Sequence, residues 1–144
     1  IDEIKTINKL VKALKQMKVN PLAFIEEVIN FQESGYDPER DVYIYRMHIA
    51  NELKNDYKIL HGGIISTFID TAMAKTILRV EGTNARIVTL DLNVRFVSPA
   101  QDGWLTAETE IIKKGKKTFL METKVLDERK KLIAKASSTF FRLK

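Results

Sequence analysis

A long apolar run behind a glycine pair constrains the fold of this chain more than any other stretch. His61, Gly62 and Gly63 lead into residues 64–78, where core-type side chains recur at the spacing of an α-helix. The recurring positions are Ile65, Phe68, Ile69, Ala72, Met73, Thr76 and Ile77. They cover more than one side of the predicted helix, so we expect other elements to wrap around it.

Two features of this predicted helix are not explained by packing. The pair Gly62 and Gly63 leaves backbone N–H groups uncovered at the helix start, where the helix dipole stabilises an oxygen that carries negative charge. Asp70 lies in mid-helix among apolar neighbours, where an unpaired carboxylate is costly. Taken alone, Asp70 could face a polar seam or pair with a lysine, or it could take part in chemistry.

Alternating apolar residues predict strands on both sides of this helix. Residues 42–53 form one strand before it, and Gly82 is a suitable C-cap for the helix. Four further strands are predicted at residues 86–97, 104–113, 117–126 and 131–142. Tight turns at residues 114–116 and 127–129 join consecutive strands. This order indicates an α+β protein, in which one principal helix covers a face of an antiparallel sheet.

Two amphipathic helices are predicted ahead of this body, at residues 2–18 and 21–33. A turn follows at residues 34–38, so we divide the chain into an N-terminal helical extension, residues 1–38, and a main domain, residues 39–144. We expect both helices to pack their apolar stripes on the main domain. The alternative is that the basic first helix contacts a membrane surface or DNA, but its lysines are spread along it, as on a solvated face.

Composition excludes several kinds of site. The chain has 144 residues, no cysteine and two histidines, so it offers no disulfide, no thiol nucleophile and no histidine-rich metal site. A formal charge of +5 favours anionic ligands such as phosphates but does not by itself indicate nucleic acid. With no apolar run of about eighteen residues and no signal-peptide pattern, we expect a soluble, cytoplasmic protein.

The order of these features is similar to that of the hotdog fold, an antiparallel sheet wrapped around a long central helix. The stretch from Val88 to Ala100, the His-Gly-Gly turn and the acid nine residues after the histidine resemble the PaaI-like branch of the 4-hydroxybenzoyl-CoA thioesterase superfamily. The resemblance covers roughly residues 40–142 and implies acyl-CoA thioesterase activity. One departure is visible at Lys58, where relatives usually have glycine, and it bears on the shape of the loop that carries Asn55.

The resemblance implies roles for five residues. The N–H of Gly62 would donate to the thioester carbonyl oxygen, with Asn55 beside it and His61 shaping or polarising the same site. Asp70 would activate the attacking water or attack the carbonyl directly, and Thr89 would support the carboxylate or the water. These residue types suit the reaction, because the carbonyl oxygen gains negative charge on attack and oriented N–H donors stabilise it.

The thioesterase interpretation implies that no metal is needed and that CoA is part of the substrate rather than a retained cofactor. Basic residues suit the phosphates of CoA. The candidates are Arg95, Lys113, Lys114, Lys116 and Lys117. The resemblance implies that the Lys-Gly-Lys hairpin lies near the nucleotide end of CoA. The alternative is that the lysines of this hairpin only increase solubility.

Helix geometry predicts a site shared by two chains. Gly62 and Asp70 are eight positions apart, which corresponds to about 12 Å along one helix. An attacking group must lie within about 3–3.5 Å of the reacting carbon, so one helix does not easily present both residues to one thioester. We therefore expect the glycine turn of one subunit to meet Asp70 and Thr89 of its neighbour in a two-fold dimer with antiparallel central helices. The resemblance implies the same homodimer, often paired into a dimer of dimers.

Three other functions stay open at this stage. The chain could be a non-catalytic acyl-CoA-binding sensor whose helical extension contacts DNA or a partner, although its first helix has no recognisable helix-turn-helix partner. A hotdog dehydratase or hydratase would need a differently placed histidine and acid. The chain could also be a structural domain without a ligand.

Overall fold

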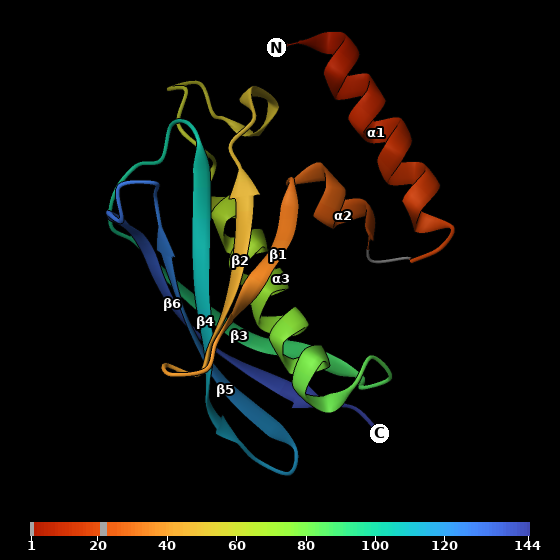
Figure 1. Cartoon of the computed structure of the whole chain (residues 1–144), viewed down its shortest axis with the longest axis vertical. Coiled ribbons are helices and arrows are strands. Elements are labelled where there is room, and N and C mark those ends of the chain that lie inside the picture. Colours follow the sequence, from red (N-terminus) through yellow and green to blue (C-terminus); the bar gives the residue numbers. More distant parts are fainter. Residues whose placement is uncertain (1, 21–22) are drawn as a thin grey trace.

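The computed structural model describes residues 2–20 and 23–144. Two helices, α1 (Glu3–Met17) and α2 (Ala23–Val28), precede a six-stranded sheet that curves around the long helix α3 (Gly62–Glu81), as Figure 1 shows. The predicted architecture, an antiparallel sheet around one principal helix, is therefore confirmed. Among the described residues, no helix combines the length and the apolar character that crossing a bilayer requires.

The strands form a single antiparallel sheet. They are β1 (Phe31–Asp37), β2 (Val42–His48), β3 (Ile87–Phe96), β4 (Trp104–Lys114), β5 (Thr118–Leu126) and β6 (Leu132–Arg142). Their spatial order is β1-β2-β4-β5-β6-β3, so β1 and β3 are the two edges. The four strands predicted after the helix are confirmed, with each end within one residue of its expected position.

The side of α3 that faces the sheet is buried along the helix. Its buried residues are Ile65, Phe68, Ile69, Ala72, Met73, Thr76 and Ile77, the positions predicted from the spacing. All of them except Thr76 belong to one hydrophobic core with inward-facing strand residues such as Tyr45, Leu105 and Phe119. The helix ends where predicted, because Gly82 has a φ of +104° and donates its N–H to the carbonyl of Leu78. Packing over this length fixes α3 relative to the sheet.

The prediction for residues 29–37 was wrong, whereas residue 38 lies in a turn as predicted. Residues Phe31–Asp37 form strand β1, rather than the end of a helix and a turn, and pair with β2. Helix α2 ends at Val28, and Asn30 follows with a φ of +58°, a left-handed conformation that stops a helix. The predicted start of this helix at residue 21 lies outside the described residues.

The strand predicted over residues 42–53 is also shorter than expected. Strand β2 ends at His48, and a 3₁₀ turn, η1 (Asn51–Leu53), follows it. The sheet therefore starts before the predicted domain boundary at residue 38, and the chain leaves β2 early to form the loop that leads to α3.

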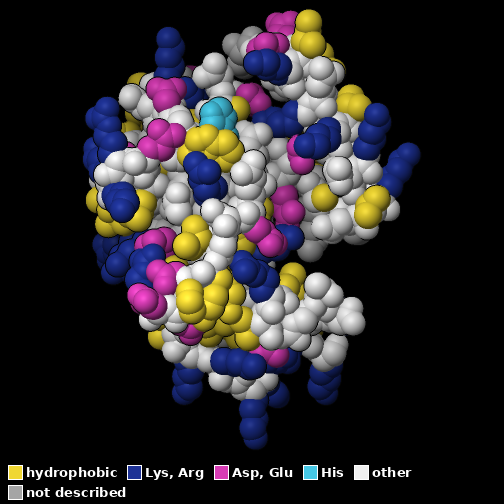
Figure 2. Space-filling view, in the orientation of Figure 1, with side chains coloured by type: hydrophobic (Ala, Val, Ile, Leu, Met, Phe, Trp, Pro, Cys, Tyr) yellow, Lys and Arg dark blue, Asp and Glu magenta, His cyan; other side chains and the backbone are white. Residues whose placement is uncertain are grey.

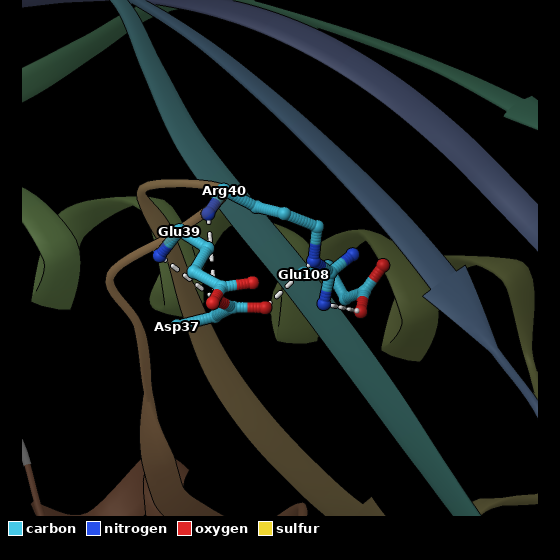
Figure 3. Close-up of polar contacts among 4 residues, drawn as sticks. All are labelled: Asp37, Glu39, Arg40 and Glu108. Atoms are coloured by element: carbon cyan, nitrogen blue, oxygen red, sulfur yellow. Dashed lines mark hydrogen bonds and ion pairs between the residues drawn. The ribbon is translucent and has the colours of Figure 1, made fainter.

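A small charged network holds the turn between β1 and β2, at residues 38–41. The carboxylate of Asp37 accepts hydrogen bonds from the backbone N–H groups of Glu39 and Arg40 and from Arg40 Nε at 2.7 Å (Figure 3). Arg40 also donates to Glu108 of β4 at 2.9 Å. These hydrogen bonds from Arg40 hold the pKa of Asp37 below its ordinary value. The network ties the edge hairpin to the middle of the sheet.

Helix α1 carries its apolar stripe on the outside, contrary to the prediction. Its exposed apolar residues are Ile4, Ile7, Leu10, Val11, Leu14 and Met17. The side of α1 that faces the body includes the buried Ala13 and Lys9, whose ammonium contacts Glu52 and the carbonyl of Val28. In Figure 2, hydrophobic and lysine side chains lie together on the outside of this helix, at the upper right. The stripe is thus left uncovered by the chain that is described.

Candidate active site

Helix α3 begins with uncapped N–H groups at the glycine pair. His61 is the N-cap residue, and its carbonyl accepts hydrogen bonds from the N–H groups of Ile64 and Ile65 at 3.0 and 3.1 Å. Within the described residues, the N–H groups of Gly62 and Gly63 have no acceptor, as the first turn of a helix requires. Two donors at the positive end of α3 are therefore available to an oxygen atom of a ligand.

The loop before α3 orients the side chain of Asn55. Its Oδ1 accepts hydrogen bonds from the N–H groups of Tyr57 at 2.9 Å and Ile59 at 3.2 Å. Because the carboxamide oxygen is used inside the loop, the NH₂ group is the end that can donate outward. Lys58 adopts a φ of +60°, so the loop keeps a glycine-like backbone at the position where a lysine departs from the family pattern.

Asn55 and Gly62 line one groove with a volume of about 300 Å³. Much of its wall is apolar and comes from Ile59, Ile65 and residues 96–100. The ring of Phe96 lies over the glycine, because a Cβ built on Gly62 would come within 3.2 Å of the ring. Sequence reasoning missed this aromatic wall, although Phe96 is part of the stretch that carries the family resemblance. A groove with N–H donors at one end and apolar walls suits a carbonyl group with an apolar substituent.

Asp70 and Thr89 form a second constellation. Thr89 Oγ1, on edge strand β3, donates to Asp70 Oδ1 at 2.7 Å. Asp70 is half-buried and Thr89 is exposed, and among the described residues Asp70 Oδ2 has no hydrogen-bond partner. Neither residue lines the groove of its own chain. Within one chain the structure therefore brings Gly62 to Asn55 and Asp70 to Thr89, in two separate places.

The remaining predicted residues are more dispersed. His61 is exposed and is not among the residues that line the groove. Lys114, in the hairpin of residues 113–117, pairs with Glu81 at the far end of α3 at 2.6 Å. Hydrogen bonds from Lys114 and Arg142 hold the pKa of Glu81 below its ordinary value.

Arg95 lies away from that hairpin within one chain. It is opposite Lys135 near one end of β3, whereas the first residue of β3, Ile87, is opposite Arg142, whose side chain donates to Lys116. Arg95 is eight positions beyond Ile87 along the strand, which corresponds to about 26 Å. One chain therefore does not gather the five predicted CoA-binding cations at one place.

Residues 57–134 match the family model of the thioesterase superfamily. The chain belongs to this superfamily. The matched residues include the glycine turn, the whole of α3 and Thr89, whereas Asn55 lies just outside them. The hotdog fold is thus that of a thioesterase-superfamily protein.

Similar proteins extend the likeness beyond the matched segment. A provisionally named esterase of Saccharolobus solfataricus is 27% identical over 128 residues, which cover 88% of this chain and 85% of that protein. A 1,4-dihydroxy-2-naphthoyl-CoA hydrolase of Listeria monocytogenes is 24% identical over 95 residues, or 66% of this chain and 77% of that one. A Bacillus halodurans protein whose crystal structure includes CoA has a TM-score of 0.85 and 25% identity, and the match covers 99% of this chain and 94% of that chain. These likenesses support a hydrolase, and the last one includes the N-terminal helices.

Proposed function

We propose that the chain hydrolyses acyl-CoA thioesters to the free acid and CoA, at a site built from two copies of the chain. The observation that carries the proposal is the pair of half-sites, with N–H donors at a groove and a carboxylate held by Thr89. Thioester hydrolysis needs both parts, a donor set for the carbonyl oxygen and a base or nucleophile. The naming of the Listeria relative as a CoA hydrolase and the CoA in the Bacillus structure support this substrate class.

In the proposed reaction, the thioester carbonyl oxygen accepts hydrogen bonds from the N–H of Gly62 and the NH₂ of Asn55. Asp70 either takes a proton from water as the water oxygen attacks the carbonyl carbon, or attacks that carbon itself to form an anhydride that water then hydrolyses. In both routes the C–S bond breaks and the CoA sulfur takes up a proton. Thr89 holds Oδ1 of Asp70, which leaves Oδ2 to face the water or the carbonyl carbon.

The shared site requires a two-fold dimer, and edge strand β3 offers a surface for one. Val88, Leu90, Phe96 and Val97 are 41–58% exposed along or just after this strand. An edge strand with unpaired backbone groups and apolar side chains is a template for pairing with a second copy. Antiparallel pairing of the central helices across the same axis would bring Asp70 of one chain to Gly62 of the other.

In the same proposed dimer, the lysines of the hairpin can contact CoA bound at the shared site, which they do not do within one chain. Glu81, which pairs with Lys114, is eleven positions beyond Asp70 on α3, or about 16 Å. In our proposal the exposed Lys113, Lys116 and Lys117 of the neighbouring subunit therefore meet the CoA phosphates at a distance from the thioester. Lys116→Ala is expected to raise KM for the CoA ester and to leave KM unchanged for a thioester that lacks the nucleotide.

The activity is tested with a panel of acyl-CoA esters and a thiol reagent that detects released CoA. Wild type is expected to hydrolyse at least one ester, and Asp70→Ala is expected to lose nearly all of this rate while staying folded. Full activity in Asp70→Ala would exclude the proposed role of the carboxylate. If wild type binds the esters tightly without hydrolysing them, the proposed activity would be wrong and the chain would be an acyl-CoA sensor.

The shared site is tested by mixing two inactive chains, Asp70→Ala and Gly62→Pro. Proline is tolerated in the first turn of a helix and removes the N–H of interest. A mixed dimer contains one site with neither change, and random mixing makes half of the dimers mixed, so about one quarter of wild-type activity should return. No recovery in a mixture shown by native mass spectrometry to contain mixed dimers would place both half-sites in one chain.

A further inference from the structure

Helix α1 presents an unpartnered apolar seam to solvent. Ile4, Ile7, Val11 and Leu14 are 43–73% exposed and follow the three-and-four spacing of a coiled-coil seam. Ala13 and Lys9 occupy the opposite side of the helix and hold it to the body. A helix of fifteen residues is marginal by itself in water, so an uncovered seam of this kind calls for a covering partner.

We propose that the seam is covered by α1 of a second copy of this chain, in an antiparallel two-fold pairing. Such a pairing places Ile4 against Leu14 of the other copy, and Ile7 against its Val11, so that four apolar layers close without a gap. Leu10, which flanks the seam and is 40% exposed, then meets Leu10 of the other copy beside the two-fold axis. The same surface therefore serves both copies, as a two-fold interface requires.

The charges of α1 favour a second copy over an anionic lipid surface. Lys9 is paired with Glu52, and Lys12 with Glu27 at 3.0 Å, so two lysines of the helix are already neutralised by carboxylates of the same chain. Lys5, Lys9 and Lys12 also occupy helical positions that face away from the seam. Two α1 helices can thus approach through their apolar layers without opposing these lysines, whereas a helix on a lipid surface binds through a lysine-rich border.

This pairing adds an interface distinct from edge strand β3. Helix α1 lies beside α2 and the β1 side of the molecule, whereas β3 is the opposite edge of the sheet (Figure 1). One pair of short helices buries too little area for a stable dimer on its own. If β3 forms the dimer of the proposed function, each dimer carries two α1 helices, and their joint pairing produces a tetramer.

The native mass of two variants tests the interface. Wild type is expected to have twice the native mass of Ile7→Gln/Val11→Gln, which places an amide in each of the two central layers. Lys5→Gln is the matched control, because it changes an exposed residue of the same helix away from the seam, and it is expected to keep the wild-type mass. Equal masses for wild type and the double variant would overturn the proposal. This readout is independent of catalysis, because the expected change from a tetramer to a dimer does not require either species to hydrolyse an ester.

Single-cysteine crosslinking tests the antiparallel geometry without relying on a destabilised seam. The chain has no cysteine of its own, so Leu10→Cys and Lys5→Cys each provide one thiol per chain. On mild oxidation, Leu10→Cys is expected to give covalent dimers and Lys5→Cys is not. Crosslinking of Lys5→Cys in place of Leu10→Cys would exclude this pairing. A different outcome would favour a lipid surface as the partner of the seam. In that case wild type would sediment with phosphatidylserine vesicles, Ile7→Gln/Val11→Gln would not, and the two proteins would have the same native mass.

Discussion

Alanine substitution at each of the two adjacent glycines separates a catalytic effect from a structural one. Gly62 and Gly63 both lie in the first turn of α3, so either change removes a glycine from the same local conformation. Their surroundings differ. A Cβ on Gly62 would come within 3.2 and 3.3 Å of two ring carbons of Phe96, whereas a Cβ on Gly63 would meet nothing within 4 Å apart from its chain neighbours and the nearby backbone of its own helix.

These distances set the expected magnitudes. A shift of the Phe96 ring by a few tenths of an ångström relieves the close contact at Gly62, so the substitution costs about 1 kcal/mol there. Replacing a helical glycine by alanine stabilises the helix by about 0.5–1 kcal/mol, which offsets this cost. Gly62→Ala should therefore change the free energy of unfolding little. The new methyl and the displaced ring would obstruct the N–H that meets the carbonyl oxygen. Loss of one such donor costs about 100- to 1000-fold, and we expect kcat/KM to fall toward the lower value, by about 100-fold.

The paired measurement is kcat/KM for one CoA ester together with the free energy of unfolding in urea at one protein concentration. Gly63→Ala is expected to raise the free energy of unfolding by about 0.5–1 kcal/mol and to keep kcat/KM within about twofold of wild type. Equal loss of activity in both variants, or no loss in Gly62→Ala, would refute the assignment of the donor to Gly62.

Three further predictions follow from single contacts. Thr89→Val removes a hydrogen bond to the carboxylate of Asp70 worth about 1.5–3 kcal/mol and should lower kcat by roughly 10- to 100-fold, while Thr89→Ser keeps the hydroxyl and most of the rate. Lys58→Gly relieves a left-handed φ and should raise the melting temperature by about 3 °C, whereas Lys58→Ala, which keeps the strain, should leave it unchanged. Arg40→Gln should destabilise the fold at pH 7. Arg40 lowers the pKa of Asp37, so this ion pair stabilises the fold above the ordinary value of 3.8, and its stabilisation is lost as the pH falls through the lowered pKa. The free energy of unfolding in urea should therefore differ less between Arg40→Gln and wild type at pH 3 than at pH 7.

The parts of the fold that could be predicted from sequence are those that burial makes periodic. Helix α3 and strands β4 to β6 bury one face each, so their apolar residues repeat at the spacing of the element. Edge strand β3 has no fully buried residue, but its sequence keeps the alternation at Leu90, Leu92 and Val94. Strand β1 could not be found in this way, because all of its residues are partly or fully exposed and its sequence, FQESGYD, has no apolar alternation. Its hydrogen bonds to β2 depend on the backbone, which leaves no pattern in the side chains.

The orientation of α1 shows a second limit. Its sequence predicted an amphipathic helix, and that helix is present at Glu3–Met17. An amphipathic pattern says that one face needs covering but does not say what covers it. The buried contacts of Lys9 and Ala13 turn the apolar face outward, and these contacts involve residues far along the chain such as Glu52.

The sequence predicted which polar residues of the candidate site lie in separate places, but it did not predict the apolar wall of the groove beside Gly62. The spacing of Gly62 and Asp70 along one helix implied two separate half-sites, and the structure has Asp70 with Thr89 on one side and Gly62 with Asn55 on the other. Phe96 could not be assigned from the sequence, because its contact with Gly62 depends on the place where β3 ends beside the start of α3.

In the proposed dimer each site is completed by the second subunit, so activity is expected to depend on association. Helix α3 is buried along its length and acts as a rigid spacer, so the separation of about 12 Å between its two half-sites does not close by bending within one chain. Specific activity should therefore fall when the enzyme is diluted below the dissociation constant of the dimer, and native mass measured at the same concentrations should fall with it. In the proposal the substrate contacts both chains and so stabilises the dimer. At saturating substrate, the loss of specific activity should therefore occur at a lower protein concentration. Constant specific activity across a range where the native mass drops to that of one chain would show that a single α3 serves both halves of the reaction.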